Sequence, residues 1–168
     1  MNSSPTPTTP AAAIAADTSL GAVSLTASDL DRSRAFYETA LGLSVREADD
    51  GALAFAVPGG ADLVRLYGDP SAPALDRRAT GLYHQAILFP TRLDLAHALA
   101  RLAEAQWPLD GVADHLVSEA LYLSDPDGNG VELYRDRPEA EWPRPADGEG
   151  VAMVSEPLDL QALLEEAA

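Results

Sequence analysis

The stretch ALYLSDPDGNGVELYRD, residues 120–136, decides the fold of this chain. Two runs of alternating apolar residues flank a DPDGNG turn, and this pattern predicts a hairpin of two β-strands. Glu132 stands in the middle of the second strand, between the apolar residues Val131 and Leu133. A buried carboxylate without a partner is strongly destabilising or takes up a proton. The sequence therefore raises the question of which cation, metal or donor lies beside Glu132.

The segments upstream of the hairpin predict the same order of elements in both halves of the chain. In the second half, Thr91 is a suitable N-cap for a helix over residues 91–107, and Leu95, Leu99 and Leu102 share one face of it. In the first half, Ser28 or Asp29 can cap a helix that stops at Gly42. The expected strands are 20–30, 44–49, 51–60 and 61–69 in the first half, and 82–90, a short segment at 110–117, 119–126 and 130–136 in the second.

The order strand, helix, three strands thus occurs twice, which indicates an internal repeat. LGAVSL aligns with LYHQAI, and ADLVRLY aligns with NGVELY. Ala22 then corresponds to His84, and Arg65 corresponds to Glu132. We expect these four positions to converge on one cavity if the halves pair around a pseudo-twofold axis.

Composition excludes several classes of function. The chain has 168 residues, which suits one domain or two small halves with a shared core, and its net charge is −16, with every basic residue an arginine. Nucleic acid and anionic membrane surfaces are therefore not expected as partners. There is no cysteine, so a metal site would need histidines and carboxylates. No apolar run approaches the length of a membrane span, and no secretory signal is recognisable, so a cytoplasmic location is expected.

Two motifs resemble a known family. SLTASDLDRSRAFYETALGL and ALYLSDPDGNGVELY are similar to segments of the vicinal oxygen chelate superfamily, which includes glyoxalase I, bleomycin and fosfomycin resistance proteins and extradiol dioxygenases. The resemblance implies an α+β fold, in which two βαβββ modules form a half-open mixed-sheet barrel with a central cavity. It places the domain at 20–136, with modules at 20–70 and 80–136. The Pro, Thr, Ser and Ala content of residues 1–19 predicts a flexible arm, and the leucine pattern near the end of the tail at 137–168 predicts a short amphipathic helix.

LYHQAILFPTRLDL and DHLVSEALYLSDPDGNGVELYRDRPEAEWPR look more specifically like the N-terminal half of the four-module catechol 2,3-dioxygenases of bacilli. By this resemblance His84 and Glu132 are metal ligands, His115 is an acid–base residue and Tyr122 is an active-site tyrosine. The implied cofactor is a divalent metal, Fe(II) or Mn(II), the implied substrate is a small aromatic molecule, and a homodimer is expected. The sequence departs from the family at Ala22, where a further histidine ligand is usual.

Two other functions stay open from the sequence. An Arg65–Glu132 pair across the pseudo-twofold would satisfy both groups and predicts a metal-free small-molecule binding protein of the resistance type, with a degenerate metal site. A glyoxalase-like isomerase or lyase is the third possibility. His97, in the predicted helix 91–107, is expected at the surface without a role in the site.

Overall fold

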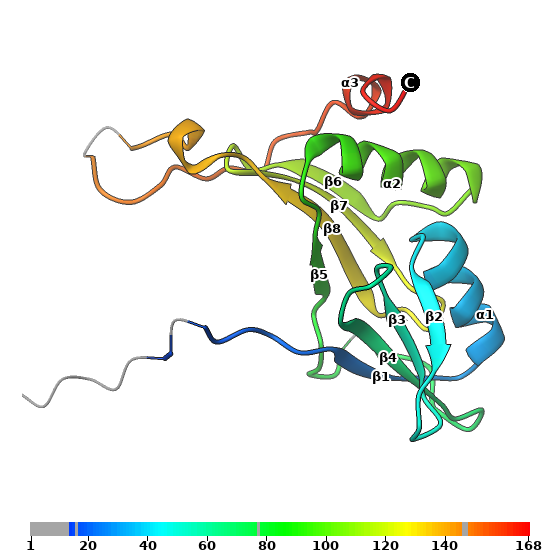
Figure 1. The fold of residues 1–168 in the computed structure, drawn as a ribbon. Helices are drawn as coiled ribbons and strands as arrows, with labels where there is room; N and C mark the ends of the chain where they lie inside the picture. The colour runs from blue at the N-terminus through cyan, green and yellow to red at the C-terminus, as the bar shows by residue number, and fades with distance from the viewer. Residues whose placement is uncertain (1–13, 16, 77, 146–147) are drawn as a thin grey trace, which may run out of the picture.

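Each half of the chain builds one four-stranded mixed sheet, and the two sheets have the same strand order (Figure 1). The computed structural model describes residues 14–15, 17–76, 78–145 and 148–168. The first half contains β1 (Val23–Ala27), α1 (Leu30–Ala35), the π-helical turn η1 (Phe36–Ala40), β2 (Ser44–Glu47), β3 (Leu53–Ala56) and β4 (Asp62–Gly68). The second contains β5 (Gln85–Leu88), α2 (Arg92–Glu104), β6 (Gly111–Asp114), β7 (Ser118–Ser124) and β8 (Gly130–Asp136), followed by η2 (Glu139–Glu141) and α3 (Leu160–Glu165).

The strand register confirms the predicted repeat. The sheets run β1-β4-β3-β2 and β5-β8-β7-β6, and in each the first strand pairs in parallel with the last. Val23 lies opposite Val64 in the first sheet, and Gln85 lies opposite Val131 in the second. Arg65 and Glu132 therefore occupy equivalent positions, as the sequence alignment predicts.

Local sequence explains the helices. Asp29 caps α1 by accepting a hydrogen bond from the Arg32 backbone N–H, and Thr91 caps α2 by accepting one from Asp94. The first helix continues through η1 and ends before Gly42, whose φ of +76° suits glycine. Leu95, Leu99 and Leu102 are buried along α2, as predicted.

One hydrophobic core joins both halves. Phe36 from η1 packs on Trp107 with ring centroids 4.6 Å apart, and the buried Tyr37 hydroxyl donates to Asp125 at 3.1 Å. The side chains of Val131 and Leu133 are each 1% exposed in this core, so the alternation of a strand directs Glu132 to the opposite face of its sheet. The fold is α+β, as expected.

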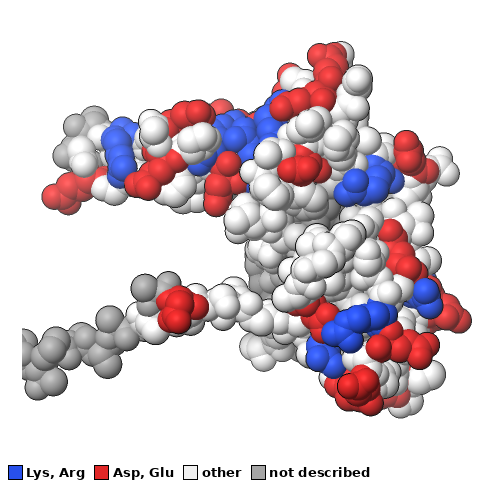
Figure 2. Space-filling view, viewed as in Figure 1, with Lys and Arg blue, Asp and Glu red and all other residues white. Residues whose placement is uncertain are grey.

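The segments before β1 and after β8 lie on the side of the molecule opposite the helices α1 and α2. Residues 17–22 and residues 137–145 both extend away from α1 and α2, toward the same side of the molecule (Figure 1). Most of the arm predicted at 1–19 lies outside the described residues. Charged side chains gather at the two ends of the face shown in Figure 2, with a band of uncharged atoms between them. None of the helices in the described part of the chain has the length and apolar character that crossing a membrane requires.

Candidate functional site

His84 and Glu132 lie in direct contact on neighbouring strands. Glu132 is in β8, and His84 immediately precedes β5, the parallel partner of β8. His84 Nε2 lies 2.8 Å from Glu132 Oε2, and the two side chains are 28% and 14% exposed. The imidazole is thus one answer to the question of what partners the carboxylate.

Gly130 allows this close approach. A Cβ at position 130 would lie 2.4 Å from the backbone oxygen of Tyr83 and 2.9 Å from Cβ of His84. Both distances are far below van der Waals contact, so only glycine fits without displacing the backbone that carries His84. The DGNG turn therefore reverses the chain and, through Gly130, also makes room for the backbone that carries His84.

Tyr122 holds the second oxygen of Glu132. The two residues are directly opposite each other in the β7–β8 register, and the Tyr122 hydroxyl donates to Glu132 Oε1 at 2.9 Å. Burial, together with the hydrogen bond to Glu132 and the charge on that carboxylate, raises the pKa of Tyr122 to about 12. Tyr122 is therefore a hydrogen-bond donor at neutral pH, not a base.

His115 completes a row of four side chains. It follows β6, and its Nε2 lies 3.0 Å from the Tyr122 hydroxyl oxygen, while its Nδ1 lies 2.6 Å from the backbone oxygen of Val154. We call His84, Glu132, Tyr122 and His115 the polar row. They come from four separate places in the second half of the chain, and all four are residues that the sequence singles out.

The donors and acceptors of the polar row define where a proton can move. The Val154 carbonyl can only accept, so His115 Nδ1 carries a hydrogen. Tyr122 has one hydrogen, and donating it to Glu132 leaves its oxygen to accept from His115 Nε2–H. If His115 Nε2 has no hydrogen, it becomes an acceptor and competes with Glu132 for the Tyr122 proton. Because the raised pKa of Tyr122 disfavours its anion, Tyr122 can pass its hydrogen to His115 Nε2 only as its oxygen takes another from a bound group.

A cavity of about 760 Å³ lies beside the row, lined in part by His84 and Tyr122. Its outer wall comes from the segment between the two sheets, with Leu75, Leu82 and Tyr83 among the lining residues. The ring of Tyr83 lies 5.0 Å from that of His84, centroid to centroid. A volume of this order accommodates a small aromatic molecule.

Ala22 and Arg65, the two residues of the first half that the sequence places at the site, have other surroundings in the structure. Of the four positions, only His84 is among the described residues that line this cavity, while Ala22, Arg65 and Glu132 are not, so the expected convergence of the four on one cavity is wrong. The proposed Arg65–Glu132 pair is also wrong: Arg65 Nη2 donates to Asp50 at 2.9 Å, and Nη1 lies 3.8 Å from Asp62. The two sheets are separately hydrogen-bonded, so Arg65 finds its carboxylates within its own half.

The polar row offers a metal two donors. Ligands at ~2.1 Å in adjacent octahedral positions are about 3.0 Å apart, so a histidine nitrogen and a carboxylate oxygen separated by 2.8 Å are spaced for one ion. Tyr122 would orient the carboxylate from outside, as residues behind metal ligands commonly do. Within the described residues, no cluster of three His, Asp or Glu side chains could hold a metal. The donor set therefore fits a site in which His84 and Glu132 would be the two protein ligands.

Two parts of the site have no signal in the sequence. Val154 acts through a backbone carbonyl, which every residue has, and it is 39 positions away from His115. The cavity wall at residues 75–76 and 78–83 has no helix or strand whose periodicity could place it. His97 is exposed on α2, as expected.

Comparison with known proteins finds matches over most of the chain. The family model for the Glyoxalase/Bleomycin resistance protein/Dioxygenase superfamily matches residues 19–133. The chain is 47% identical over 152 residues to a protein named catechol-2,3-dioxygenase from Bacillus subtilis, covering 90% of this chain and 53% of that relative, its N-terminal half. It is 37% identical over 75 residues to biphenyl-2,3-diol 1,2-dioxygenase 3 from Rhodococcus globerulus, covering 44% of this chain and 40% of that relative. The chain thus spans about half the length, or less, of these relatives.

Solved structures share the fold. A glyoxalase/dioxygenase from Nostoc punctiforme superimposes with a TM-score of 0.62 at 23% identity, over 76% of this chain and 98% of that one. A glyoxylase/bleomycin resistance protein/dioxygenase domain from Frankia sp. EAN1pec gives a TM-score of 0.62 at 24% identity, over 73% and 94% of the two chains. With the family model covering most of the sequence and the repeat visible in the strand register, the chain belongs to the glyoxalase/bleomycin resistance protein/dioxygenase superfamily.

Proposed function

We propose that this chain forms the substrate site of an extradiol-dioxygenase-like enzyme that acts on catechol-type small molecules. The observation that carries the proposal is the polar row beside the cavity. In it the imidazole of His84 contacts the carboxylate of Glu132, and Tyr122 links that carboxylate to a second histidine, His115. The names of the two relatives, which concern catechol and a biphenyl diol, support an aromatic ring with neighbouring hydroxyls as the substrate.

In this proposal His84 and Glu132 hold a divalent metal, Fe(II) or Mn(II). When bound, such an ion binds the neighbouring oxygens of a diol and makes its hydroxyls more acidic. Glu132 keeps its orientation because Tyr122 donates to the oxygen that does not face His84. The nitrogen of His84 and the oxygen of Glu132 that now contact each other would both have to face the ion when it is bound.

Tyr122 and His115 handle the proton that a diol gives up. Tyr122 remains protonated because its pKa is raised to about 12, so it donates a hydrogen bond and does not repel an anionic substrate oxygen. His115 Nε2, 3.0 Å away, receives or returns a proton through the tyrosine hydroxyl. Contributions of this kind are worth roughly 10²–10⁴ in rate.

The cavity favours a neutral ring over a carboxylated one. Among the described residues that line it, Asp76 and Asp110 are acidic and none is an arginine. A catechol with a carboxylate would meet negative charge without a cationic partner, whereas an alkyl or aryl substituent would contact Leu75 and Leu82. We therefore expect catechol and 4-methylcatechol to bind more tightly than 3,4-dihydroxybenzoate.

A metal-free small-molecule binding protein is the second candidate. It is favoured by Ala22, which offers no ligand, and by the two-residue donor set. The contact on which this candidate first rested does not exist, since Arg65 binds Asp50 and not Glu132. On this reading the diol binds with the same affinity with or without metal.

The two candidates separate in one experiment. Protein is loaded anaerobically with Fe(II) or Mn(II), catechol binding is measured by titration calorimetry, and oxygen uptake is then recorded after air is admitted. The enzyme reading predicts metal-dependent binding and oxygen uptake that Glu132→Gln abolishes. Arg65→Gln, at the equivalent strand position, is the matched control and should change neither. Catechol binding that is independent of metal, without oxygen uptake, would instead support the binding protein.

A further inference from the structure

The segment of residues 151–166, here the docking segment, lies against the second sheet and α2. Backbone hydrogen bonds join it to the end of β6: the Asp114 N–H donates to the Glu156 oxygen at 2.8 Å, and the Glu156 N–H donates to the Asp114 oxygen at 3.0 Å. This antiparallel bridge fixes the docking segment beside the residue that precedes His115.

The bridge brings a carbonyl to the His115 ring. Val154, two residues before Glu156, places its oxygen 2.6 Å from His115 Nδ1, and the Ser155 hydroxyl is more distant at 3.4 Å. Because a carbonyl only accepts, the contact keeps a hydrogen on Nδ1 in both charge states of the ring. The nitrogen that exchanges its proton is then Nε2, the one that faces Tyr122.

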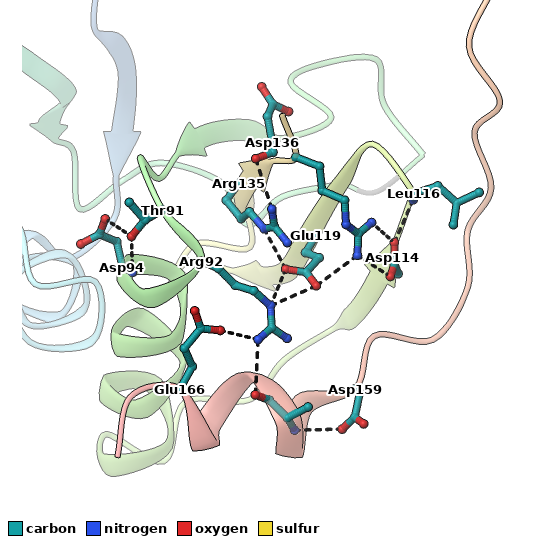
Figure 3. A network of polar contacts seen from close by, with 12 residues as sticks. Thr91, Arg92, Asp94, Asp114, Leu116, Glu119, Arg135, Asp136, Asp159 and Glu166 are labelled. Atoms are coloured by element: carbon teal, nitrogen blue, oxygen red, sulfur yellow. Dashed lines mark hydrogen bonds and ion pairs between the residues drawn. The ribbon is translucent and has the colours of Figure 1, made fainter. Parts of the chain in front are cut away.

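The far end of the docking segment is anchored on α2. Leu163 of α3 is fully buried and Leu158 is 7% exposed. Arg92 of α2 donates to the Ala162 carbonyl at 3.4 Å and forms an ion pair with Glu166 (Figure 3). These contacts hold α3 in place although it has only six residues.

The same ionic network reaches Asp114, the residue before His115. Glu119, whose side chain is 5% exposed, pairs with Arg92 at 2.9 Å, Arg135 at 2.8 Å and Arg137 at 3.2 Å. Arg137 also holds both oxygens of Asp114, at 2.5 and 2.8 Å (Figure 3). The network therefore connects the docking of α3 with the residue next to His115.

We propose that the docking segment is a positioning element of the site: it orients the His115 ring and fixes its Nδ1–H form through the Val154 carbonyl. The proposal rests on the proposed function in one respect: the proposed function assigns proton transfer through Tyr122 to His115. Released from the segment, the ring is free to rotate and to carry its hydrogen on either nitrogen, and the proton path to Tyr122 is lost in part of the population.

The test follows the ring nitrogens of His115 by ¹⁵N NMR in metal-free protein, over a range of pH values that includes the neutral ring. Leu163→Ala/Glu166→Gln removes the anchor on α2, and Glu156→Pro removes one bridge hydrogen bond. Exchange of the Asp114 amide hydrogen reports whether the segment is released. The chain has three histidines, so a His97→Gln background simplifies assignment. Gln161→Ala, an exposed position of the same helix, is the matched control.

In the wild type and the Gln161→Ala control we expect Nδ1 to stay protonated. In both releasing variants the ratio of the two neutral forms should fall about fivefold or more, the effect of losing one hydrogen bond. Faster Asp114 exchange with an unchanged His115 would overturn the proposal, and so would unchanged Asp114 exchange in both variants, because the named contacts would then not hold the segment. The readout needs neither metal nor diol. A changed tautomer in a protein that binds no catechol would count against the proposed function alone.

Discussion

Gly130→Ala should separate His84 from Glu132 without removing either side chain. The added methyl carbon would lie 2.4 Å from the Tyr83 carbonyl oxygen, where ordinary contacts begin at 3.4 Å, so the backbone before β5 must move by about 1 Å. A shift of this size along the contact would lengthen the His84 Nε2–Glu132 Oε2 distance from 2.8 Å to about 3.8 Å, beyond hydrogen-bond reach.

Two quantities measure the effect. Overpacking of this kind costs about 1–3 kcal/mol, which urea unfolding would show as a lower midpoint. A misplaced ligand should weaken Mn(II) binding by roughly 10- to 100-fold, measured by calorimetry. Gly21→Ala is the control, because a Cβ there meets nothing within 4 Å and Gly21 has no positive φ. A Gly130→Ala protein with wild-type stability and wild-type Mn(II) affinity would refute the claim that glycine is needed for this approach.

Three further predictions concern the row and the ionic network. Tyr122→Phe removes the hydroxyl that orients Glu132 and faces His115; metal affinity should fall by roughly 10- to 100-fold, and at saturating metal the oxygen uptake with catechol should fall by roughly 10²–10⁴. Unchanged turnover would exclude Tyr122 from proton handling. Glu119→Gln leaves three arginines around a buried neutral group and should lower the free energy of unfolding by about 3 kcal/mol, whereas Glu38→Gln, in an exposed helical pair, should cause no measurable change. The hydrogen bonds from Arg137 lower the pKa of Asp114 from 3.8 to about 2, so its contribution of about 2 kcal/mol is complete above pH ~4 and is lost as pH falls toward 2. Urea unfolding of Asp114→Asn should lack that part of the acid-induced loss; an identical pH dependence in both proteins would contradict the assignment.

The sequence predicts that His84, Tyr122 and Glu132 lie together because the signals for their positions are local. Glu132 is conspicuous between apolar neighbours, and the repeat places His84 at the start of the predicted strand that pairs with it. The spacing of Tyr122 and Glu132 around a short turn puts them opposite each other in a hairpin. Each of these inferences follows from the period of a strand or the register of one turn.

The partners that the sequence misassigns are set by tertiary structure. Arg65 matches Glu132 in the repeat, but its partner Asp50 lies in the turn between β2 and β3, which no alignment of the two halves reveals. The strand predicted at 82–90 begins only at Gln85, so His84 lies just outside it, beside Gly130. Val154 reaches His115 because α3 docks on α2, a packing that residue types alone do not specify.

The metal content of the purified protein tests the central claim most directly. Protein prepared without a histidine tag and incubated with Fe(II) or Mn(II) is desalted and measured by inductively coupled plasma mass spectrometry, beside Glu132→Gln and the control Arg65→Gln. We predict near-stoichiometric metal in the wild type and in Arg65→Gln, and its loss in Glu132→Gln. Protein that retains no metal in any form, or retains it equally in Glu132→Gln, would contradict the assignment of His84 and Glu132 as ligands.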